Sequence, residues 1–366
     1  MPVVIWFLIF PLSPSTYVFA GGAKESLTYS EFLKKSSQEP VRFICAKFNT
    51  YPIVLLGEHH RIKQQVDFVK NLIRPLKTAG VSVLVLEFGD YRLQPILDGL
   101  LNANTFDKNK VNAILKTVDK PLGWGYQEYS DIFEEVWKTN RETQTARIKI
   151  LLGNYELEND EAQWTAILNV WNVKMPHRQF GNTADCKKYA DSHSEEVGGF
   201  ITQNKENIAT AFKKLQDSQE EIKGVKIAEL AGTAYLQGSK VLIYAGRNHL
   251  IAHTNKLRAY SSGWLLNHRY PGKVYSIAFR STERADNLIE KEVSANTRQP
   301  IAFPLNTGPF GSLQFDDKFK MRDAWDGYIF LCPKEDYLPV TVIPGFFGTH
   351  ESERKEFLRK QIAAFK

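Results

Sequence analysis

The hydrophobic positions of this chain gather in short runs that stop abruptly at polar residues. The run at 54–57, Val-Leu-Leu-Gly, is followed by Glu58, His59 and His60, and three later runs end in the same way. A short apolar run bounded by Gly is typical of a buried strand. We predict strands at residues 52–56, 81–86, 147–153, 241–245, 273–279 and 327–331.

The segment between the first two strands has the spacing of a helix that lies on a sheet. Its apolar residues recur at intervals of three and four, at Ile62, Val66, Val69, Leu72, Ile73 and Leu76. The following strand, 81–86, is apolar at nearly every position, as a parallel strand covered on both faces must be. A right-handed crossover places strands 52–56 and 81–86 side by side or one apart. We therefore predict an α/β fold with a mostly parallel central sheet flanked by helices.

Two later segments depart from this pattern. Residues 159–221 form the most polar part of the chain, and we expect a helical insertion there that caps the carboxyl edge of the sheet. Residues 281–326 are rich in Asn, Thr, Pro and Gly, which indicates a long surface excursion. Apart from the N-terminus, all of these segments belong to one predicted domain, residues 21–366.

The first twenty residues differ from the rest. A short apolar stretch leads to Val18-Phe19-Ala20, which fits a secretory signal peptide cleaved after Ala20. A membrane anchor or a buried first strand is the alternative. No cysteine precedes Cys45, so no lipoprotein anchor is expected. We expect a mature protein that starts at Gly21, has no stable membrane span and lies in the periplasm or outside the cell.

Composition narrows the classes of function. The chain has 366 residues, of which 43% are hydrophobic and 24% charged, as in soluble globular proteins. Its net charge is +6, but basic and acidic residues are interleaved without a basic block, so we expect no nucleic-acid partner. The three cysteines, Cys45, Cys186 and Cys332, allow at most one disulfide.

The polar residues at the strand ends are the candidate chemistry. Because parallel strands end at one edge of a sheet, Glu58, His60, Glu87 and His249 are expected to meet there. A carboxylate beside an imidazole fixes its tautomer and raises its basicity, which suits a general base that activates water. The same four side chains are also a plausible ligand set for a divalent metal. Adjacent residues of an extended chain point opposite ways, so only one of His59 and His60 can face this site.

Four more residues are candidates for substrate binding. Arg247 could hold an anionic group or an oxyanion by a forked contact. Trp124 and Tyr126 either line a ligand pocket or belong to the core, and Asn154 ends its own strand. Each residue also has an ordinary structural interpretation: a His at a strand end is often a satisfied core group, and Glu58 could simply cap the next helix. No Gly-x-Ser-x-Gly elbow, His-Glu-x-x-His motif or phosphate-binding loop occurs.

Five short motifs in this order resemble one superfamily. It joins ChaN-type haem-binding uptake proteins, Tiki proteases and erythromycin esterases, and the resemblance spans about residues 50 to 331. The motifs are Gly57-Glu58-x-His60, Leu86-Glu87-Phe88, Trp124-Gly125-Tyr126, Leu152-Gly153-Asn154 and Gly246-Arg247-Asn248-His249. The resemblance implies one of two activities on a small-molecule or peptide ligand. The first is hydrolysis of an ester or amide, and the second is binding of haem or another iron compound without catalysis.

Overall fold

The computed structural model of the chain describes residues 28–116, 124–142, 147–154, 159–254, 260–280 and 283–365. The predicted signal peptide, residues 1–20, lies outside these ranges. None of the helices within them has the length and apolar character needed to cross a membrane.

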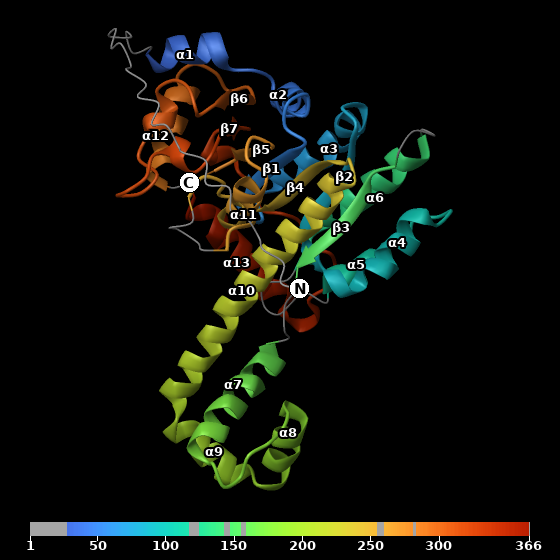
Figure 1. Cartoon of the computed structure of the whole chain (residues 1–366), viewed down its shortest axis with the longest axis vertical. Coiled ribbons are helices and arrows are strands. Elements are labelled where there is room, and N and C mark those ends of the chain that lie inside the picture. Colours follow the sequence, from blue (N-terminus) through green and yellow to red (C-terminus); the bar gives the residue numbers. More distant parts are fainter. Residues whose placement is uncertain are drawn as a thin grey trace, which may run out of the picture.

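A seven-stranded sheet forms the centre of the molecule (Figure 1). Its strands lie in the order β3-β2-β4-β1-β5-β7-β6, and every neighbouring pair is parallel except β6 and β7. The strands are β1 (Ile53–Glu58), β2 (Val81–Asp90), β3 (Lys149–Asn154), β4 (Lys240–Gly246), β5 (Val274–Ala278), β6 (Ile301–Pro304) and β7 (Gly327–Phe330). The predicted α/β fold with a mostly parallel sheet is confirmed, and β1 and β2 lie one strand apart, with β4 between them.

Alternating side chains of the buried strands supply two cores, one on each face of the sheet. In β1, Val54 and Leu56 enter the first core, whereas Ile53 and Leu55 enter the second. The first core is covered by α2 (Pro40–Lys47), α3 (Lys63–Thr78), α4 (Gln94–Asn102), α5 (Lys108–Lys116), α6 (Gln127–Glu142) and α13 (Glu351–Ala363). The second is covered by α1 (Tyr29–Ser36), α10 (Lys205–Leu236), α11 (Ser262–Arg269) and α12 (Glu283–Ser294).

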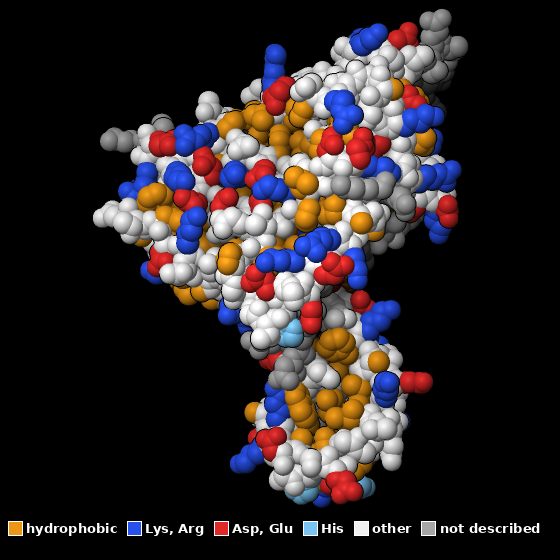
Figure 2. Space-filling view, turned by 180° about the vertical axis from the view of Figure 1, so that it is seen from behind, with side chains coloured by type: hydrophobic (Ala, Val, Ile, Leu, Met, Phe, Trp, Pro, Cys, Tyr) orange, Lys and Arg blue, Asp and Glu red, His pale blue; other side chains and the backbone are white. Residues whose placement is uncertain are grey.

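The polar segment 159–221 builds an arm that extends away from the body (Figure 1). It contains α7 (Asn159–Lys174), α8 (Thr183–Ser192), α9 (Ser194–Gln203) and the first half of α10. These helices enclose a small core of their own around Trp171, and Figure 2 shows hydrophobic side chains gathered on one face of this helical arm. Helix α10 is continuous, and its second half packs on the sheet through Ile227 and Ala231. The middle of α10 lies at the carboxyl edge of the sheet, where Lys223 is 3.5 Å from Glu87 of β2.

The predicted surface excursion at 281–326 is wrong for two elements inside it. Helix α12 buries Ala285 and Ile289, and β6 adds an antiparallel edge strand that buries Ala302 and Phe303. Strand β6 has only four residues and ends in Pro304, so it is too short to show a period of two in the sequence.

Short 3₁₀ helices occupy several connections. They are η1 (Tyr91–Leu93), η2 (Arg247–His249), η3 (Phe310–Ser312), η4 (Met321–Asp323), η5 (Lys334–Asp336) and η6 (Gly348–His350). Of these, η1 follows β2 and η2 follows β4. All three cysteines are free thiols.

Candidate functional site

Glu58, the last residue of β1, holds His60 in a fixed orientation. The Glu58 side chain is 1% exposed, and its Oε1 lies 2.6 Å from Nδ1 of His60. Because an ionised carboxylate only accepts hydrogen bonds, this contact assigns the proton to Nδ1 and the lone pair to Nε2 in the neutral imidazole. The His60 side chain remains 30% exposed, so water can reach the ring.

Two tyrosines complete the surroundings of Glu58. Tyr129 of α6 donates its hydroxyl hydrogen to Oε1 at 2.8 Å, and Tyr244 of β4 donates to Oε2. Burial, together with the charge of Glu58, raises the pKa of both phenols well above the ordinary value. Both hydroxyls therefore stay protonated and act as donors that stabilise the carboxylate.

Glu87 of β2 is the centre of a second group of contacts. Its Oε2 accepts the backbone N–H of Gly246 at 2.5 Å, and its Oε1 lies 3.2 Å from Nε2 of His249 and 3.5 Å from Nζ of Lys223. Burial alone would raise the pKa of Glu87, but the charges of His249, His60 and Lys223 outweigh burial and lower it well below the usual range. Glu87 is therefore an anion inside the protein.

His249 in η2 is shared between two carboxylates. Its Nε2 lies 3.2 Å from Glu87 and 3.2 Å from Oε2 of Glu220 on α10. Burial lowers the pKa of His249, but the two carboxylates outweigh it, so the pKa is raised. Lys223, one turn further along α10, lies 3.0 Å from Oε1 of Glu220. The middle of α10 thus supplies one cation and one anion to the sheet edge.

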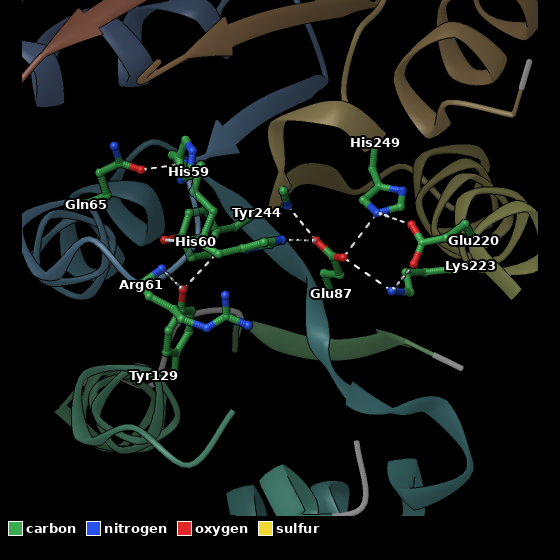
Figure 3. Close-up of polar contacts among 12 residues, drawn as sticks. His59, His60, Arg61, Gln65, Glu87, Tyr129, Glu220, Lys223, Tyr244 and His249 are labelled. Carbon is green, nitrogen blue, oxygen red and sulfur yellow. Dashed lines mark hydrogen bonds and ion pairs between the residues drawn. The ribbon is translucent and has the colours of Figure 1, made fainter. Parts of the chain in front are cut away.

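His60 joins these two groups into one row. Its Nε2 lies 3.8 Å from Oε2 of Glu87, beyond hydrogen-bond distance. Figure 3 shows the row running from His60 through Glu87 to His249, Glu220 and Lys223. The structure therefore brings together the side chains that the strand ends predicted would meet: Glu58, His60, Glu87 and His249.

Gly246 makes this arrangement possible. A Cβ atom at this position would lie 2.5 Å from Nε2 and 2.7 Å from Cε1 of His60, closer than real contacts allow. Trp124 packs against the same ring edge-to-face, with centroids 4.9 Å apart. The imidazole is therefore fixed by packing as well as by Glu58.

The two adjacent histidines face different surroundings. His60 faces the two glutamates, whereas the His59 ring packs against Phe365 with centroids 4.2 Å apart. Burial lowers the pKa of His59 to about 3, with further lowering by Arg247 and Arg280, so the ring is neutral. The chain turns directly afterwards, where Arg61 has a φ of 71° and its N–H donates to the Tyr129 hydroxyl at 3.2 Å.

The other predicted binding residues lie elsewhere. Tyr126 is fully buried, and its hydroxyl accepts a hydrogen bond from Arg354 of α13 at 2.6 Å. Asn154 is buried at the end of β3, in register with Asp90 of β2. Arg247 follows Gly246 but belongs to the opposite face of the sheet. Of the four, Trp124 packs against the ring of His60.

The predicted metal set does not have the geometry of a ligand shell. Within the described ranges, no group of three or more His, Cys, Asp and Glu side chains is arranged to hold a metal ion. The physical reason is that the glutamate oxygens are already engaged. Glu58 accepts from two tyrosines and His60, and Glu87 accepts from Gly246 and lies beside the cation of Lys223.

Four residues of the site were not predicted from the sequence. Tyr244 lies within a predicted strand and Tyr129 on the apolar face of a predicted helix, and nothing in the pattern distinguishes their hydroxyls from those of core tyrosines. Glu220 and Lys223 lie in a long polar segment. The one available signal is that Lys223 is followed by Gly224, where a Cβ atom would lie 2.0 Å from the carbonyl oxygen of Tyr260. This close approach puts the middle of α10 against the body.

Comparisons with known proteins support the fold. No family model matches the chain, and no curated protein matches its sequence. Among solved structures, a Bacillus cereus protein has a TM-score of 0.55 at 11% identity over 86% of this chain and 98% of its own. A mutant of the erythromycin esterase EreC matches with a TM-score of 0.48 at 12% identity, over 79% of this chain and 92% of its own. A haem-bound ChaN of Campylobacter jejuni matches with a TM-score of 0.42 at 16% identity, over 81% of this chain and 91% of its own. The match to the Bacillus cereus protein shows a shared fold, and its 11% identity carries no conclusion about activity.

Proposed function

We propose that this protein is an exported hydrolase that cleaves an ester or amide bond in a small-molecule or peptide substrate, with His60 as the general base. The observation that carries the proposal is the 2.6 Å contact between Nδ1 of His60 and the buried Glu58. This contact leaves Nε2 with a lone pair on a ring that is 30% exposed. A carboxylate-oriented imidazole with one free nitrogen is the usual form of a histidine base.

The proposed reaction uses His60 twice. Nε2 removes a proton from a water molecule, and the resulting hydroxide adds to the carbonyl carbon of the substrate. The imidazolium then gives that proton to the leaving alcohol or amine as the carbon–oxygen or carbon–nitrogen bond breaks. Glu58 stabilises the imidazolium until that proton is transferred, and the hydroxyls of Tyr129 and Tyr244 hold the Glu58 side chain in place.

Glu87 and His249 are assigned a supporting role. The His249 side chain is only 6% exposed and its Nε2 already faces two carboxylates, so it is poorly placed to contact a substrate. Glu87 lies 3.8 Å from Nε2 of His60, and its negative charge favours the protonated imidazole that forms during catalysis. We assign Glu87 as an electrostatic partner of His60, and His249 and Lys223 as the cations that keep Glu87 ionised.

The geometry supports binding of haem less well. An axial histidine must present an open nitrogen to the iron of a flat macrocycle. Nδ1 of His60 is bonded to Glu58, and Nε2 has the backbone of Gly246 and the carboxylate of Glu87 beside it. A haemin titration distinguishes the two functions: we expect no saturable Soret shift that depends on His60.

Hydrolysis of a panel of esters and amides tests the proposal. We expect His60→Gln to lower kcat/KM by about a hundredfold to ten thousandfold, the usual contribution of a general base. His350→Gln is the matched control, because His350 lies in η6 with its side chain 77% exposed and pairs with the exposed Glu353. Equal activity of His60→Gln and the wild type on every hydrolysed substrate would refute the role of His60.

Export is part of the same proposal and has its own test. We expect the intact mass of the protein recovered from outside the cytoplasm to correspond to a chain that starts at Gly21. Recovery of the uncut chain from the cytosol would contradict it.

A further inference from the structure

A second set of polar side chains lies on the other face of the same sheet edge. In register, Gly246 of β4 pairs with Glu58 of β1, and Ala278 of β5 pairs with Gly57. Arg247 begins η2 directly after β4, and Arg280 lies two residues beyond the end of β5. Both lie on the side of the second core: Arg280 pairs with Asp286 of α12, and the charge of Asp286 also acts on Arg247. Because β1 runs between β4 and β5, the two arginines flank its end, where His59 lies.

Contacts place these side chains around a common region. Phe365 packs against the His59 ring, and the guanidinium of Arg280 lies 5.1 Å from the centroid of the same phenylalanine. Arg247 and Trp325 both lie against Gly57 of β1. A Cβ atom added to Gly57 would be 3.1 Å from Cα of Arg247 and 2.8 Å from the ring of Trp325. The end of β1 is thus surrounded by two arginines, a histidine and an indole.

Buried polar atoms of Arg280 and His59 have no hydrogen-bond partner within the described part of the chain. Arg280 is 5% exposed, yet its Nη1 makes no hydrogen bond, and neither does Nδ1 of His59. A buried donor without a partner is unfavourable, because it has given up its hydrogen bonds to water. A guanidinium nitrogen can only donate, so the missing partner of Arg280 is an acceptor.

The positive charges of Arg247 and Arg280 also favour a negatively charged acceptor. Asp286 of α12 pairs with Nε of Arg280 at 3.2 Å and also accepts the hydroxyl hydrogen of Tyr328 at 3.0 Å. No hydrogen bond or ion pair engages the half-buried Arg247 among the residues the structure describes. Burial lowers the pKa of Arg247. The charge of Asp286 raises this pKa, whereas the charge of Arg280 lowers it further. Asp286 thus pairs directly with Arg280, whereas the guanidinium of Arg247 carries its positive charge in a partly desolvated place without an ion pair to any described residue.

We propose that Arg247 and Arg280, with His59 and Trp325 beside them, bind an oxyanion group of the substrate, a carboxylate or a phosphate. This inference rests on the proposed hydrolase function and specifies its substrate class as an anionic ester or amide. The substrate's charged group is held on one face of the β1 end, and its scissile bond reaches His60 on the other. Forked guanidinium contacts are well suited to both kinds of oxyanion.

Binding of simple anions tests this site without any turnover. The full-length mature protein is titrated with inorganic phosphate and, separately, with acetate, at constant ionic strength, by calorimetry and by thermal shift. We expect saturable binding of at least one anion. Tighter binding of phosphate would identify the substrate's charged group as a phosphate, and tighter binding of acetate would identify it as a carboxylate. Arg247→Gln should weaken it by roughly tenfold to a hundredfold, and Arg247→Lys, which keeps the charge, by less.

Two further variants serve as controls. Arg298→Gln removes an exposed arginine that pairs with Asp336 at 2.9 Å, and it should bind the anion as the wild type does. His60→Gln should also retain anion binding, because His60 faces the other group of side chains. Absence of saturable binding to the wild type, or equal binding by wild type and a folded Arg247→Gln, would overturn the inference. Anion binding that persists while no substrate is hydrolysed would refute the hydrolase alone.

Discussion

Gly246 determines how closely His60 can approach Glu87. The position of its missing Cβ lies 2.5 Å from Nε2 of His60 and 3.1 Å from Oε2 of Glu87. We predict that Gly246→Ala displaces the imidazole from Glu58 and lowers kcat/KM at least tenfold, because small misplacements of a catalytic group are costly. Kinetics combined with a structure of the variant checks this. An unmoved His60 with full activity would show that the ring position is unimportant.

The stability of the protein should depend on pH through His249. The folded state raises the pKa of His249, because Glu87 and Glu220 outweigh the effect of burial. In the unfolded chain the pKa of His249 is about 6.5. Because the pKa is higher in the folded state, protonation of His249 stabilises the fold at pH values below about 6.5, and this contribution disappears as the pH rises through the folded-state pKa. We predict that His249→Gln reduces the free energy of unfolding more at pH 6 than at pH 9.

Chemical denaturation of the wild type and His249→Gln at the two pH values measures this difference. The same series on His350→Gln corrects for general effects, since that side chain is exposed. A loss of stability that is equal at pH 6 and pH 9 would mean that His249 carries no additional charge in the folded state.

Helix α10 is the element that joins the arm to the site. Its middle turn carries Glu220 and Lys223 to the sheet edge, and Gly224 lets it approach the backbone at Tyr260. We predict that Gly224→Ala destabilises the protein by about 1–3 kcal/mol, because the added methyl group meets a carbonyl oxygen that cannot move away easily. The change should also lower activity, since it shifts the lysine that faces Glu87.

Another helical glycine provides the matched control. Gly198 lies inside α9, and a Cβ atom there would have no neighbour within 4 Å. Gly198→Ala should therefore raise stability by about 0.5–1 kcal/mol, the ordinary helix propensity of alanine over glycine. Thermal and denaturant unfolding of both variants checks the pair. Equal effects would show that α10 does not need close contact at residue 224.

The whole molecule consists of a body and an arm with separate cores. Trp171 is fully buried in the arm, with its ring 4.5 Å from that of Phe200. We predict that Trp171→Ala weakens the arm by about 3–5 kcal/mol while the sheet keeps its protection. Hydrogen exchange should speed up in residues 183–203 and stay unchanged in β1 and β4. Equal loss of protection in the sheet would mean that body and arm unfold as one unit.

Much of the body could be predicted from the sequence because its strands are buried on both faces. The runs at 53–56, 83–86 and 241–245 are apolar at every position, which is the pattern of parallel strands covered on both faces. Strand β6 escaped prediction because its place is fixed by pairing with β7, not by a pattern of its own. The continuity of α10 was also hidden, since its two halves bury different faces in different cores.

The candidate site could be predicted only in part. Glu58, His60, Glu87 and His249 directly follow or end strands, so the fold alone assembles them. Tyr129 and Lys223 come from helices, and which helical face meets the strand ends depends on tertiary packing. The surroundings of Tyr126 and Arg247 depend on tertiary packing for the same reason: the Tyr126 hydroxyl accepts a hydrogen bond from Arg354 of α13, and Arg247 lies on the face of the sheet opposite His60.

Glu58 and His60 should act as one catalytic unit, and a double-mutant cycle on kcat/KM measures whether they do. Glu58→Gln keeps the size of the side chain but cannot stabilise an imidazolium, so we predict a loss of about a hundredfold to ten thousandfold. The double variant Glu58→Gln/His60→Gln should be no slower than His60→Gln alone, because the carboxylate works only through the ring. If the losses of the two single variants multiplied in the double variant, or if Glu58→Gln were fully active, Glu58 and His60 would not act as one unit.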